Sequence, residues 1–298
     1  MAELSFINVF GLVTLQDGGR PGLRHRGIPL GGYADRGSAR LANALVGEYA
    51  DAPVVEFAQA AAQIHFSEAL DWAWSGAPAE LTVDGCPFEP NRRHHALAGA
   101  VFSVCGPYRG RFGYLALGAT IAASRRDGSV SPLQLGMQWS PAENVLGTGT
   151  TLHVTSRGQQ PIRRAFAPIA AEELRSFTLY RGPEYARFAR WVAGHPSLLA
   201  RGLPRLSDMR WEVLADSNRV GLRLGHPDGP RLARLFAGAS IRSSPTIPGT
   251  VQVTPDGQLI VALADGPTMG GYPRMGWVAQ EELGALAQET SSVRFRLG

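Results

Sequence analysis

Hydrophobic residues occur along most of this 298-residue chain in short runs that alternate with polar residues and end at glycine, proline, aspartate or asparagine. Short runs with this punctuation are typical of β-strands. Two dipeptides, Asp84-Gly85 and Asp256-Gly257, separate neighbouring runs and predict hairpins. The pattern predicts strands at Leu4–Val9, Leu12–Leu15, Val54–Ala58, Gln63–Phe66, Leu70–Trp74, Leu81–Val83, Val101–Cys105, Tyr114–Leu117, Leu152–Thr155, Phe177–Tyr180, Trp211–Leu214, Gly221–Leu224, Val251–Val253, Leu259–Leu263 and Val293–Leu297.

Helical periodicity is confined to three short segments. Arg36–Val46 carries apolar residues at helical spacing, with Asp35 placed as an N-cap and Gly47 as a stop. Glu184–Val192 and Glu281–Gln288 show weaker patterns of the same kind. Many strands and few helices favour a mainly β fold of barrels or sandwiches over a doubly wound parallel sheet.

The length of the chain fits one large domain or two of ordinary size. No internal repeat of fixed period is evident in the sequence. The segment Gln159–Ala171 has the weakest hydrophobic patterning, and it therefore marks the best candidate for a boundary. We expect an N-terminal half at residues 1–165 and a C-terminal half at residues 166–298.

The composition limits the chemistry, because all 29 basic residues are arginine and the chain contains no lysine. This excludes a Walker-A lysine, a Schiff-base lysine and a lysine that carries biotin covalently. The arginines are not interleaved with aromatic residues along one stripe, so we expect no nucleic-acid partner. No apolar run is long enough to span a bilayer, and the first residues lack a secretory pattern. We therefore expect a cytoplasmic protein without a membrane partner.

Polar residues gather first between Leu15 and Glu56. Gln16, Asp17 and Arg20 follow a predicted strand and lie in a glycine-rich loop. Asp35 directly precedes the first predicted helix, and Asn43 lies within it. The loop amides are suited to an anion, but the same residues also suit a well-capped turn in which Asp17 binds nearby amides. Glu56, inside an apolar run, either points outward or is a buried carboxylate paired with arginine.

Two later segments, Asp216–Leu224 and Ile247–Val278, hold the remaining candidates. Gln252 is a polar residue between valines, and Asp265 ends an apolar strand, which is a usual position for a functional carboxylate. Thr268, Gly270, Gly271 and Tyr272 follow in a loop, where the glycines would allow positive φ angles and a close approach of the backbone to a ligand. A simple Gly-Gly corner between strands remains the alternative.

Other familiar catalytic patterns are missing from the sequence. The seven histidines do not have metal-ligand spacing, so we expect no metal site. Gly147–Thr151 reads GTGTT and lacks the lysine of a phosphate-binding loop. There is no G-x-S-x-G elbow, so a serine triad has no support.

Taken in order, three segments resemble one known family. The first segment contains QDGGRPG, followed by GIP, AD and RLAN. The second contains SNRVG. The third contains PGTVQV, PDGQ, LAD, PT and GGYPR. This order is similar to that of the KipA family, the allophanate hydrolase subunit 2-like or biotin-dependent carboxyltransferase family, which includes the C subunit of bacterial 5-oxoprolinase. The likeness spans roughly residues 12–295.

The resemblance implies two cyclophilin-like β-barrel units and a stable partner of the KipI type, which is the B subunit of 5-oxoprolinase. It implies a complex that uses ATP to open 5-oxoproline to glutamate, with the ATP site on this chain or on a partner. One alternative is a carboxyltransferase that uses biotin carried on a partner protein, as in urea carboxylase. Another alternative is a non-catalytic regulatory module of the KipI–KipA type. In each enzymatic case the ligand is a small amide or carboxylate.

The resemblance also assigns residues to a site. Asp265, Tyr272 and Arg274 are expected to be catalytic, with Asp265 as a general base or amide holder and Arg274 as a clamp for carboxylate or phosphate. The amides of Gly270 and Gly271 would stabilise an oxyanion. The expected substrate-binding residues are Gln16, Asp17, Arg20, Asp35, Asn43, Arg219, Gln252, Thr268, Gly270 and Gly271.

The chain departs from the family pattern in three places. Residues 31–35 read GGYAD where the family commonly has SGAMD, and residues 124–129 match the family's central GSRST segment only weakly. Arg274 stands where the family usually carries lysine. If a titratable amine acts there as an acid or base, the arginine predicts slow or absent turnover; if it acts only as a charge clamp, arginine can serve with altered geometry.

Overall fold

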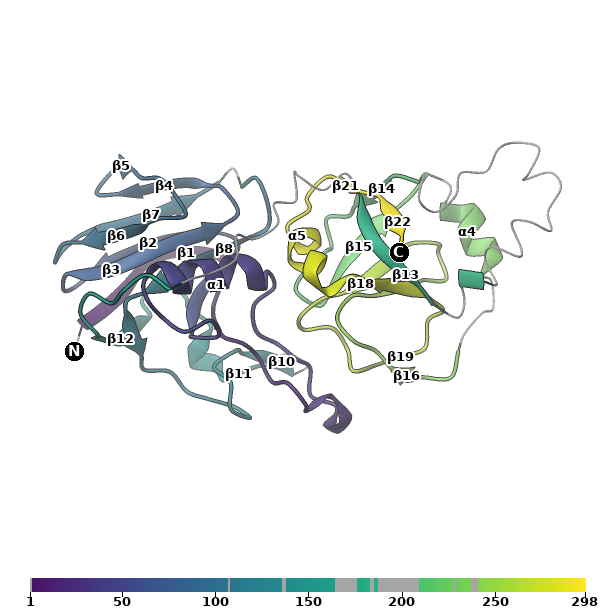
Figure 1. The fold of residues 1–298 in the computed structure, drawn as a ribbon, viewed down its shortest axis with the longest axis horizontal. Coiled ribbons are helices and arrows are strands. Elements are labelled where there is room, and N and C mark those ends of the chain that lie inside the picture. Colours follow the sequence, from purple (N-terminus) through teal and green to yellow (C-terminus); the bar gives the residue numbers. More distant parts are fainter. Residues whose placement is uncertain are drawn as a thin grey trace. The chain divides into compact units, whose positions relative to one another are not determined.

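The computed structural model divides the chain into two compact units, which are described separately (Figure 1). Unit 1 comprises Met1–Pro21 and Gly31–Pro168, and unit 2 comprises Gly22–Leu30 and Ile169–Gly298. The structure describes residues 2–106, 108–135, 138–163, 176–182, 185–186, 209–227, 229–236 and 241–298. The predicted boundary at residues 165 and 166 lies outside these ranges and stays a prediction. We call residues 22–30 the strap, because they belong to unit 2 while the chain on both sides of them belongs to unit 1.

Unit 1 is built around a ten-stranded sheet that contains two long central strands. These strands, β1 and β2, pair antiparallel over most of their length. The elements of unit 1 are β1 (Ala2–Gln16), α1 (Arg36–Leu45), β2 (Val54–Phe66), β3 (Leu70–Gly76), β4 (Glu80–Val83), β5 (Cys86–Pro87), β6 (Arg93–Ala96), β7 (Val101–Cys105), β8 (Phe112–Leu117), β9 (Ala119–Ile121), β10 (Leu133–Leu135), β11 (Gln138–Ser140), a 3₁₀ turn η2 (Ala142–Asn144) and β12 (Thr151–Ser156).

A bulge in the central ribbon explains how the sheet of unit 1 curves. The β1–β2 register shifts at Phe10/Leu12, where Gly11 has a φ of 90° and Gln59 has a φ of 49°. On one side of this bulge β2 pairs with β8, and on the other side it pairs with β7. Extra residues in one strand bend a sheet and increase its twist. The sequence pattern predicted two separate strands here, whereas the structure contains one bulged strand.

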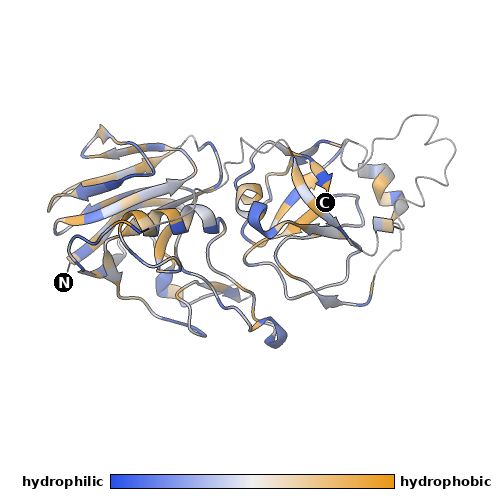
Figure 2. Ribbon diagram, viewed as in Figure 1, coloured by the Kyte–Doolittle hydropathy of each residue, from blue (hydrophilic) through white to orange (hydrophobic). Residues whose placement is uncertain are grey.

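The core of unit 1 is aromatic. Trp72, Trp74, Phe57 and Phe102 are fully buried and contact one another through tilted and edge-on ring arrangements. Such rings bury a large apolar area and define the spacing between the layers. Helix α1 packs against β3 and β8 of this sheet. The helix carries both hydrophobic and hydrophilic residues (Figure 2).

Unit 2 is a nearly closed β-barrel. Its eight-stranded sheet runs in the order β21, β14, β15, β18, β17, β20, β13 and β22, and only Arg294 separates the first strand from the last in the sequence. Closure of a sheet removes its exposed edges. The elements of unit 2 are η1 (Arg24–Arg26), β13 (Phe177–Arg181), β14 (Trp211–Val213), β15 (Gly221–Gly225), α4 (Gly229–Leu235), β16 (Ser244–Pro245), β17 (Thr250–Val253), β18 (Leu259–Ala262), β19 (Met269–Gly270), β20 (Arg274–Val278), η5 (Gln280–Glu282), α5 (Leu283–Ala287), β21 (Ser292–Val293) and β22 (Phe295–Leu297).

The mainly β fold with few short helices is confirmed. The hairpins at Asp84-Gly85 and Asp256-Gly257 are also confirmed, and Asp84, Gly85 and Gly257 have positive φ angles. Helix α1 begins after Asp35, as the capping pattern predicted. Most of the predicted helix Glu184–Val192 lies outside the described residues. Within the described ranges, no helix has both the length and the apolar character needed to cross a bilayer.

Candidate functional site

The thirteen residues predicted to form a site fall into two groups, one in each unit. Unit 1 holds Gln16, Asp17, Arg20, Asp35 and Asn43. Unit 2 holds Arg219, Gln252, Asp265, Thr268, Gly270, Gly271, Tyr272 and Arg274. All residues of a group lie in the same unit, so the two groups are described separately.

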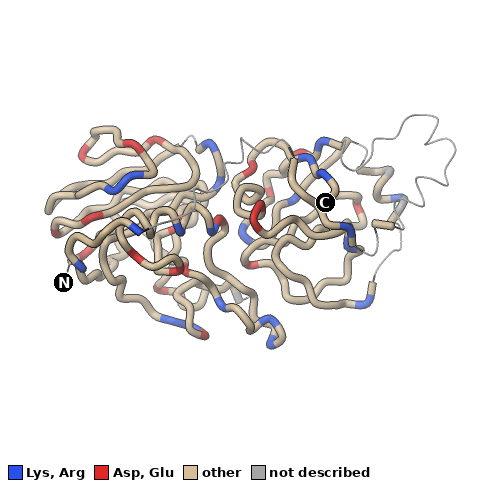
Figure 3. The backbone as a smooth tube through the Cα atoms, in the orientation of Figure 1, with Lys and Arg blue, Asp and Glu red and all other residues tan. Residues whose placement is uncertain are grey.

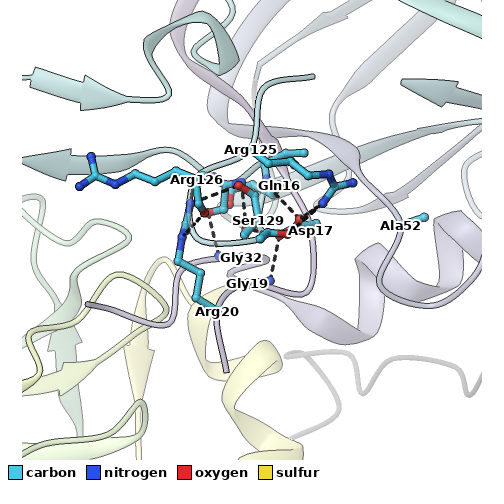
Figure 4. A network of polar contacts seen from close by, with 12 residues as sticks. Gln16, Asp17, Gly19, Arg20, Gly32, Ala52, Arg125, Arg126 and Ser129 are labelled. Atoms are coloured by element: carbon cyan, nitrogen blue, oxygen red, sulfur yellow. Dashed lines mark hydrogen bonds and ion pairs between the residues drawn. The ribbon is translucent and has the colours of Figure 1, made fainter. Parts of the chain in front are cut away.

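In unit 1, Asp17 is the centre of a buried polar network (Figure 4). Its carboxylate accepts hydrogen bonds from the amides of Gly19 and Val130, both at 2.9 Å, and from the hydroxyl of Ser129. Arg125 lies 3.4 Å from the same carboxylate. The residues that satisfy Asp17 therefore come largely from residues 125–130, which overlap the 124–129 segment that matched the family pattern only weakly.

Gln16 and Arg20 bind the same segment. Arg20 donates to the backbone carbonyls of Arg126 at 2.9 Å and Ser131 at 2.5 Å. The hydroxyl of Ser131 donates to Oε1 of Gln16, and it accepts from the amide of Gly32 at 2.9 Å. Because buried polar groups must be hydrogen-bonded, these contacts stabilise the fold of the glycine-rich loop. The local contact that the capped-turn interpretation expected is the bond from the Gly19 amide to Asp17, and the anion-binding interpretation stays a prediction.

Asp35 and Asn43 are bound within helix α1 and its surroundings. Asp35 caps the helix by accepting from the amide and the hydroxyl of Ser38. The amide of Asn43, which is fully buried, donates to the carbonyl of Ala52 at 2.9 Å. Glu56 is buried and accepts from the amide of Ala34 at 3.0 Å, so of its two alternatives the buried carboxylate is correct and the outward side chain is wrong.

In unit 2, the residues of the GGYPR segment form a corner against β16. Strand β19 pairs with β16, with Gly270 opposite Ser244. The amide of Thr246 donates to the carbonyl of Thr268, and the amide of Ile241 donates to the carbonyl of Gly271. Both glycines lie outside the positive-φ region, so the positive φ angles that glycine would allow are not used at this corner.

Steric space, not backbone conformation, accounts for glycine at position 270. A Cβ atom at this position would lie 2.5 Å from Nε2 of Gln252 and 3.0 Å from Cγ2 of Thr246. At Gly271 the nearest atoms would be at 3.4 Å, an ordinary contact. The backbone of Gly270 therefore packs directly against the amide of Gln252, whereas the predicted approach of this backbone to a ligand stays a prediction.

The Gln252 side chain is the most informative group in this corner. Gln252 is 5% exposed, and among the described residues its Nε2 has no hydrogen-bond partner. A buried amide donor without a partner costs free energy, and such groups in native structures call for a ligand, a water or another explanation. Arg274 is the cross-strand neighbour of Gln252 on β20. Its guanidinium donates to the carbonyl of Ser244 at 2.7 Å and to the Ser244 hydroxyl.

Two neighbouring donor side chains define what this corner can bind. An amide N–H and a guanidinium offer hydrogens, which suits a carbonyl or carboxylate oxygen of a small ligand. Tyr272, which is 42% exposed, and Thr268, which is half-buried, lie on the same loop. We call Ser244, Thr246, Gln252, Gly270 and Arg274 the donor corner.

Asp265 lies just before this loop and is held by Arg219. The guanidinium binds the carboxylate through two hydrogen bonds, with Nε–Oδ2 at 2.7 Å and Nη2–Oδ1 at 3.0 Å. Both side chains are largely buried, at 4% exposure for Arg219 and 12% for Asp265. Both carboxylate oxygens are thus committed to arginine. This geometry fits a carboxylate that holds the loop better than one that removes a proton.

Three residues of unit 2 that the sequence did not single out contribute to this region: Arg24, Ser244 and Thr246. Arg24, in the strap, donates to the carbonyls of Thr246 and Pro267 at 2.7 and 2.6 Å. Partial burial lowers the pKa of the Arg24 guanidinium below its ordinary value.

Charged residues are otherwise distributed over both units (Figure 3). Among the described residues, no cluster of His, Cys, Asp and Glu is suited to a metal ion.

Comparison with known proteins identifies related chains. Residues 26–297 match the family described as the carboxyltransferase domain, subdomain A and B. The chain is 30% identical over 288 residues to the C subunit of 5-oxoprolinase from Escherichia coli K12, a match that covers 96% of this chain and 87% of that protein. It is 27% identical over 290 residues to urea amidolyase of Lachancea kluyveri, covering 92% of this chain and 16% of that protein.

A solved structure shares the fold of the whole chain. The crystal structure of TTHA0988 superposes with a TM-score of 0.79 at 26% sequence identity. The match covers 100% of this chain and 55% of that protein, so the chain spans about half the length of this structural relative.

Proposed function

Since this chain belongs to the carboxyltransferase-domain family, subdomains A and B, we propose that it is one subunit of an ATP-dependent 5-oxoprolinase. In this proposal the assembled enzyme opens the ring amide of 5-oxoproline to give glutamate. The observation that carries the proposal is the match to the C subunit of 5-oxoprolinase, which extends over 87% of that relative. A subunit name implies a multi-subunit assembly, and we propose a KipI-type protein, the B subunit of 5-oxoprolinase, as the direct partner.

The donor corner of unit 2 supports a small amide or carboxylate ligand. 5-Oxoproline carries a ring carbonyl and a carboxylate, both of which accept hydrogen bonds. In the proposal, the Nε2 of Gln252, which has no hydrogen-bond partner within the described part of the chain, donates to one of these oxygens. The Arg274 guanidinium binds the carboxylate as a charged donor, and the Asp265–Arg219 pair holds the adjoining loop. The catalytic roles of Asp265 and Tyr272, and the binding roles of the unit 1 residues, stay predictions.

The chain does not offer a recognisable phosphate cradle for ATP in the GTGTT turn. The amide of Gly149 donates to the carbonyl of Phe6, and the amide of Thr150 donates to the carbonyl of Gly147. The amide of Gly147 donates to the hydroxyl of Thr150. Since these donors are used within the fold, this turn does not support a phosphate site, and we propose that a partner subunit binds ATP.

The proposal is tested by reconstitution. The chain would be mixed with the A and B subunits of 5-oxoprolinase from the same organism, together with 5-oxoproline and ATP. We expect glutamate to form only when ATP and all subunits are present. An assembled, folded complex that forms no glutamate would contradict the proposal.

The second candidate is a carboxyltransferase that acts on biotin carried by another protein. The family description and the match to urea amidolyase favour it. Biotin would then reach the chain as a partner's group, because a chain without lysine cannot carry it covalently. Dependence of turnover on bicarbonate and on a biotinylated partner distinguishes this candidate from the first.

The third candidate is a regulatory module that acts through a KipI-type partner without catalysis. The arginine at position 274, where the family usually has lysine, favours it. Gln252→Met separates this candidate from the enzymatic ones, because it removes the amide donor at similar volume. We expect the variant to lose turnover while it still binds the partner. Unchanged biological effect together with unchanged partner binding would favour the regulatory module.

A further inference from the structure

The strap forms a short basic turn whose geometry directs one side chain into unit 2. Arg24–Arg26 form the 3₁₀ turn η1, which ends at Gly27 with a φ of 78°. The amide of Gly27 donates to the carbonyl of Arg24, and Nδ1 of His25 donates to the carbonyl of Gly22 at 2.8 Å. His25 and Arg26 are exposed, whereas Arg24 is half-buried.

The Arg24 guanidinium binds carbonyl groups of two separate loops. Its Nε and Nη2 donate to the carbonyl of Thr246, at 3.1 and 2.7 Å. Nη2 also donates to the carbonyl of Pro267 at 2.6 Å, and Nη1 lies 3.5 Å from the carbonyl of Gly266. The planar fork of arginine can serve several acceptors at once, which the single ammonium of lysine cannot do with the same geometry.

The carbonyls that Arg24 binds belong to the residues around the donor corner. Gly266 and Pro267 directly follow Asp265, whose carboxylate is held by Arg219. Thr246 itself donates through its hydroxyl to Pro267 and through its amide to Thr268. Two arginines from distant parts of the sequence thus fix the loop that leads from Asp265 to β19.

We propose that Arg24 is a positioning residue that ties the 265–268 loop to Thr246 and thereby holds Gly270 against the amide of Gln252. The activity assay that tests this inference rests on the proposed function. The predicted change in hydrogen–deuterium exchange does not depend on that function. Without the Arg24 fork, the loop keeps the Asp265–Arg219 pair and the Thr246 bonds to Pro267 and Thr268, but it loses the charged donor that binds the Gly266, Pro267 and Thr246 carbonyls together. The donor corner then loses its fixed geometry, and a ligand oxygen would no longer meet both donors at once.

The test uses the full chain with Arg24→Gln, Arg24→Lys and, as a matched control, Arg26→Gln from the exposed side of the same turn. Hydrogen–deuterium exchange would be followed in peptides that cover residues 244–250 and 264–271. We expect Arg24→Gln to accelerate exchange in these peptides by about tenfold, because it loses a charge-assisted set of hydrogen bonds. Arg24→Lys is expected to restore part of the protection, and Arg26→Gln to match the wild type.

Two further readouts separate positioning from general stability. The unfolding midpoint of Arg24→Gln, followed by tryptophan fluorescence, is expected to stay close to that of the wild type. In the assembled complex we expect a rise in KM that Arg24→Lys partly reverses. Unchanged exchange in Arg24→Gln, or accelerated exchange spread evenly over the chain, would overturn the inference. A wild-type complex without activity would contradict the proposed function, and the exchange data would still decide the role of Arg24.

Discussion

At the scale of single residues, the fit between Gly270 and Gln252 gives a sharp prediction. Gly270→Ala places a Cβ atom 2.5 Å from Nε2 of Gln252, so the amide or the backbone has to move. We expect a loss of about 1–3 kcal/mol in the free energy of unfolding, as for other overpacked sites. Ligand affinity should fall as well, because the displaced amide belongs to the donor corner. Urea denaturation and ligand titration measure the two effects.

The neighbouring glycine supplies the control for this substitution. Gly271→Ala meets its nearest atoms at 3.4 Å, and φ at this position is not positive. We therefore expect a small change in stability and in affinity. Equal effects of the two substitutions would show that the Gly270–Gln252 contact has no special importance.

The pair of Asp265 and Arg219 gives a second prediction at this scale. Asp265→Asn removes the negative charge that the 4% exposed guanidinium of Arg219 binds. Breaking one side of a buried pair costs about 3–5 kcal/mol, and we expect a loss near the lower end because Asp265 is partly accessible. Equilibrium unfolding in urea measures it.

An exposed pair in the same unit provides the comparison. Asp216 and Arg223 lie 3.0 Å apart, but their side chains are 61% and 40% exposed. Asp216→Asn should cost less than about 1 kcal/mol, because water screens the charges. If Asp265→Asn is as mild as this control, the pair does not hold the loop.

The sequence predicted these residues better than it predicted their partners. Asp265 was found because a carboxylate ended an apolar strand, and Arg219 because it lay in a short polar segment. No local pattern revealed that they bind each other, since 46 residues separate them. The general-base interpretation of Asp265 rested on the resemblance alone, and the bidentate pairing with Arg219 disfavours it.

At the scale of elements, the loop around Asp17 depends on its bonds to the 125–131 segment. Ser129→Ala removes one donor to the Asp17 carboxylate while the amides of Gly19 and Val130 remain. Because a buried charged acceptor loses a partner, we expect a stability loss of about 1–3 kcal/mol in urea unfolding.

Ser156→Ala tests whether any lost serine hydroxyl has this effect. Ser156 is exposed, and its hydroxyl accepts a long bond of 3.3 Å from the amide of Gly158. We expect little change in the unfolding free energy. A comparable loss in both variants would mean that the Asp17 network does not stabilise the loop beyond the average surface contact.

Alternation and turn residues predicted most strands and both hairpins, because each of these signals is local. Strands of two residues, such as β16 and β19, carry no period that a sequence can show. Their pairing depends on Thr246, Thr268 and Gly270 meeting in the folded unit. The sequence also did not predict the bulge at Gly11, since a glycine that interrupts an apolar run equally fits a break between two strands.

At the scale of the whole molecule, the chain passes between its two units three times, because the strap belongs to unit 2. The sequence suggested two consecutive halves, since the hydrophobic patterning is weakest at residues 159–171. The strap contains no such signal. In the folded chain Arg24 binds the carbonyls of Thr246 and Pro267 and so links the strap to the rest of unit 2, a long-range contact that no local pattern predicts.

The lysine-free composition makes one more experiment possible, and it tests the role of position 274. Arg274→Lys introduces the only lysine of the 298-residue chain. After reductive methylation with labelled formaldehyde, its amine can be titrated by NMR apart from the α-amino group, which titrates near pH ~8. The titration gives the pKa of this amine, which is to be compared with the ordinary lysine value of about 10.4.

The pH profile of turnover then distinguishes a clamp from an acid or base. If position 274 only binds a carboxylate, the wild type is active, and Arg274→Lys raises KM because a point charge replaces a fork. Its kcat should stay flat with pH up to the measured pKa of the introduced amine, since the amine remains charged throughout that range. A rise in kcat together with a new pH limb at that pKa would instead show that a titratable group is needed there. In that case the arginine of the natural chain marks a slow or non-catalytic member of the family, and the regulatory module becomes the better description of its function.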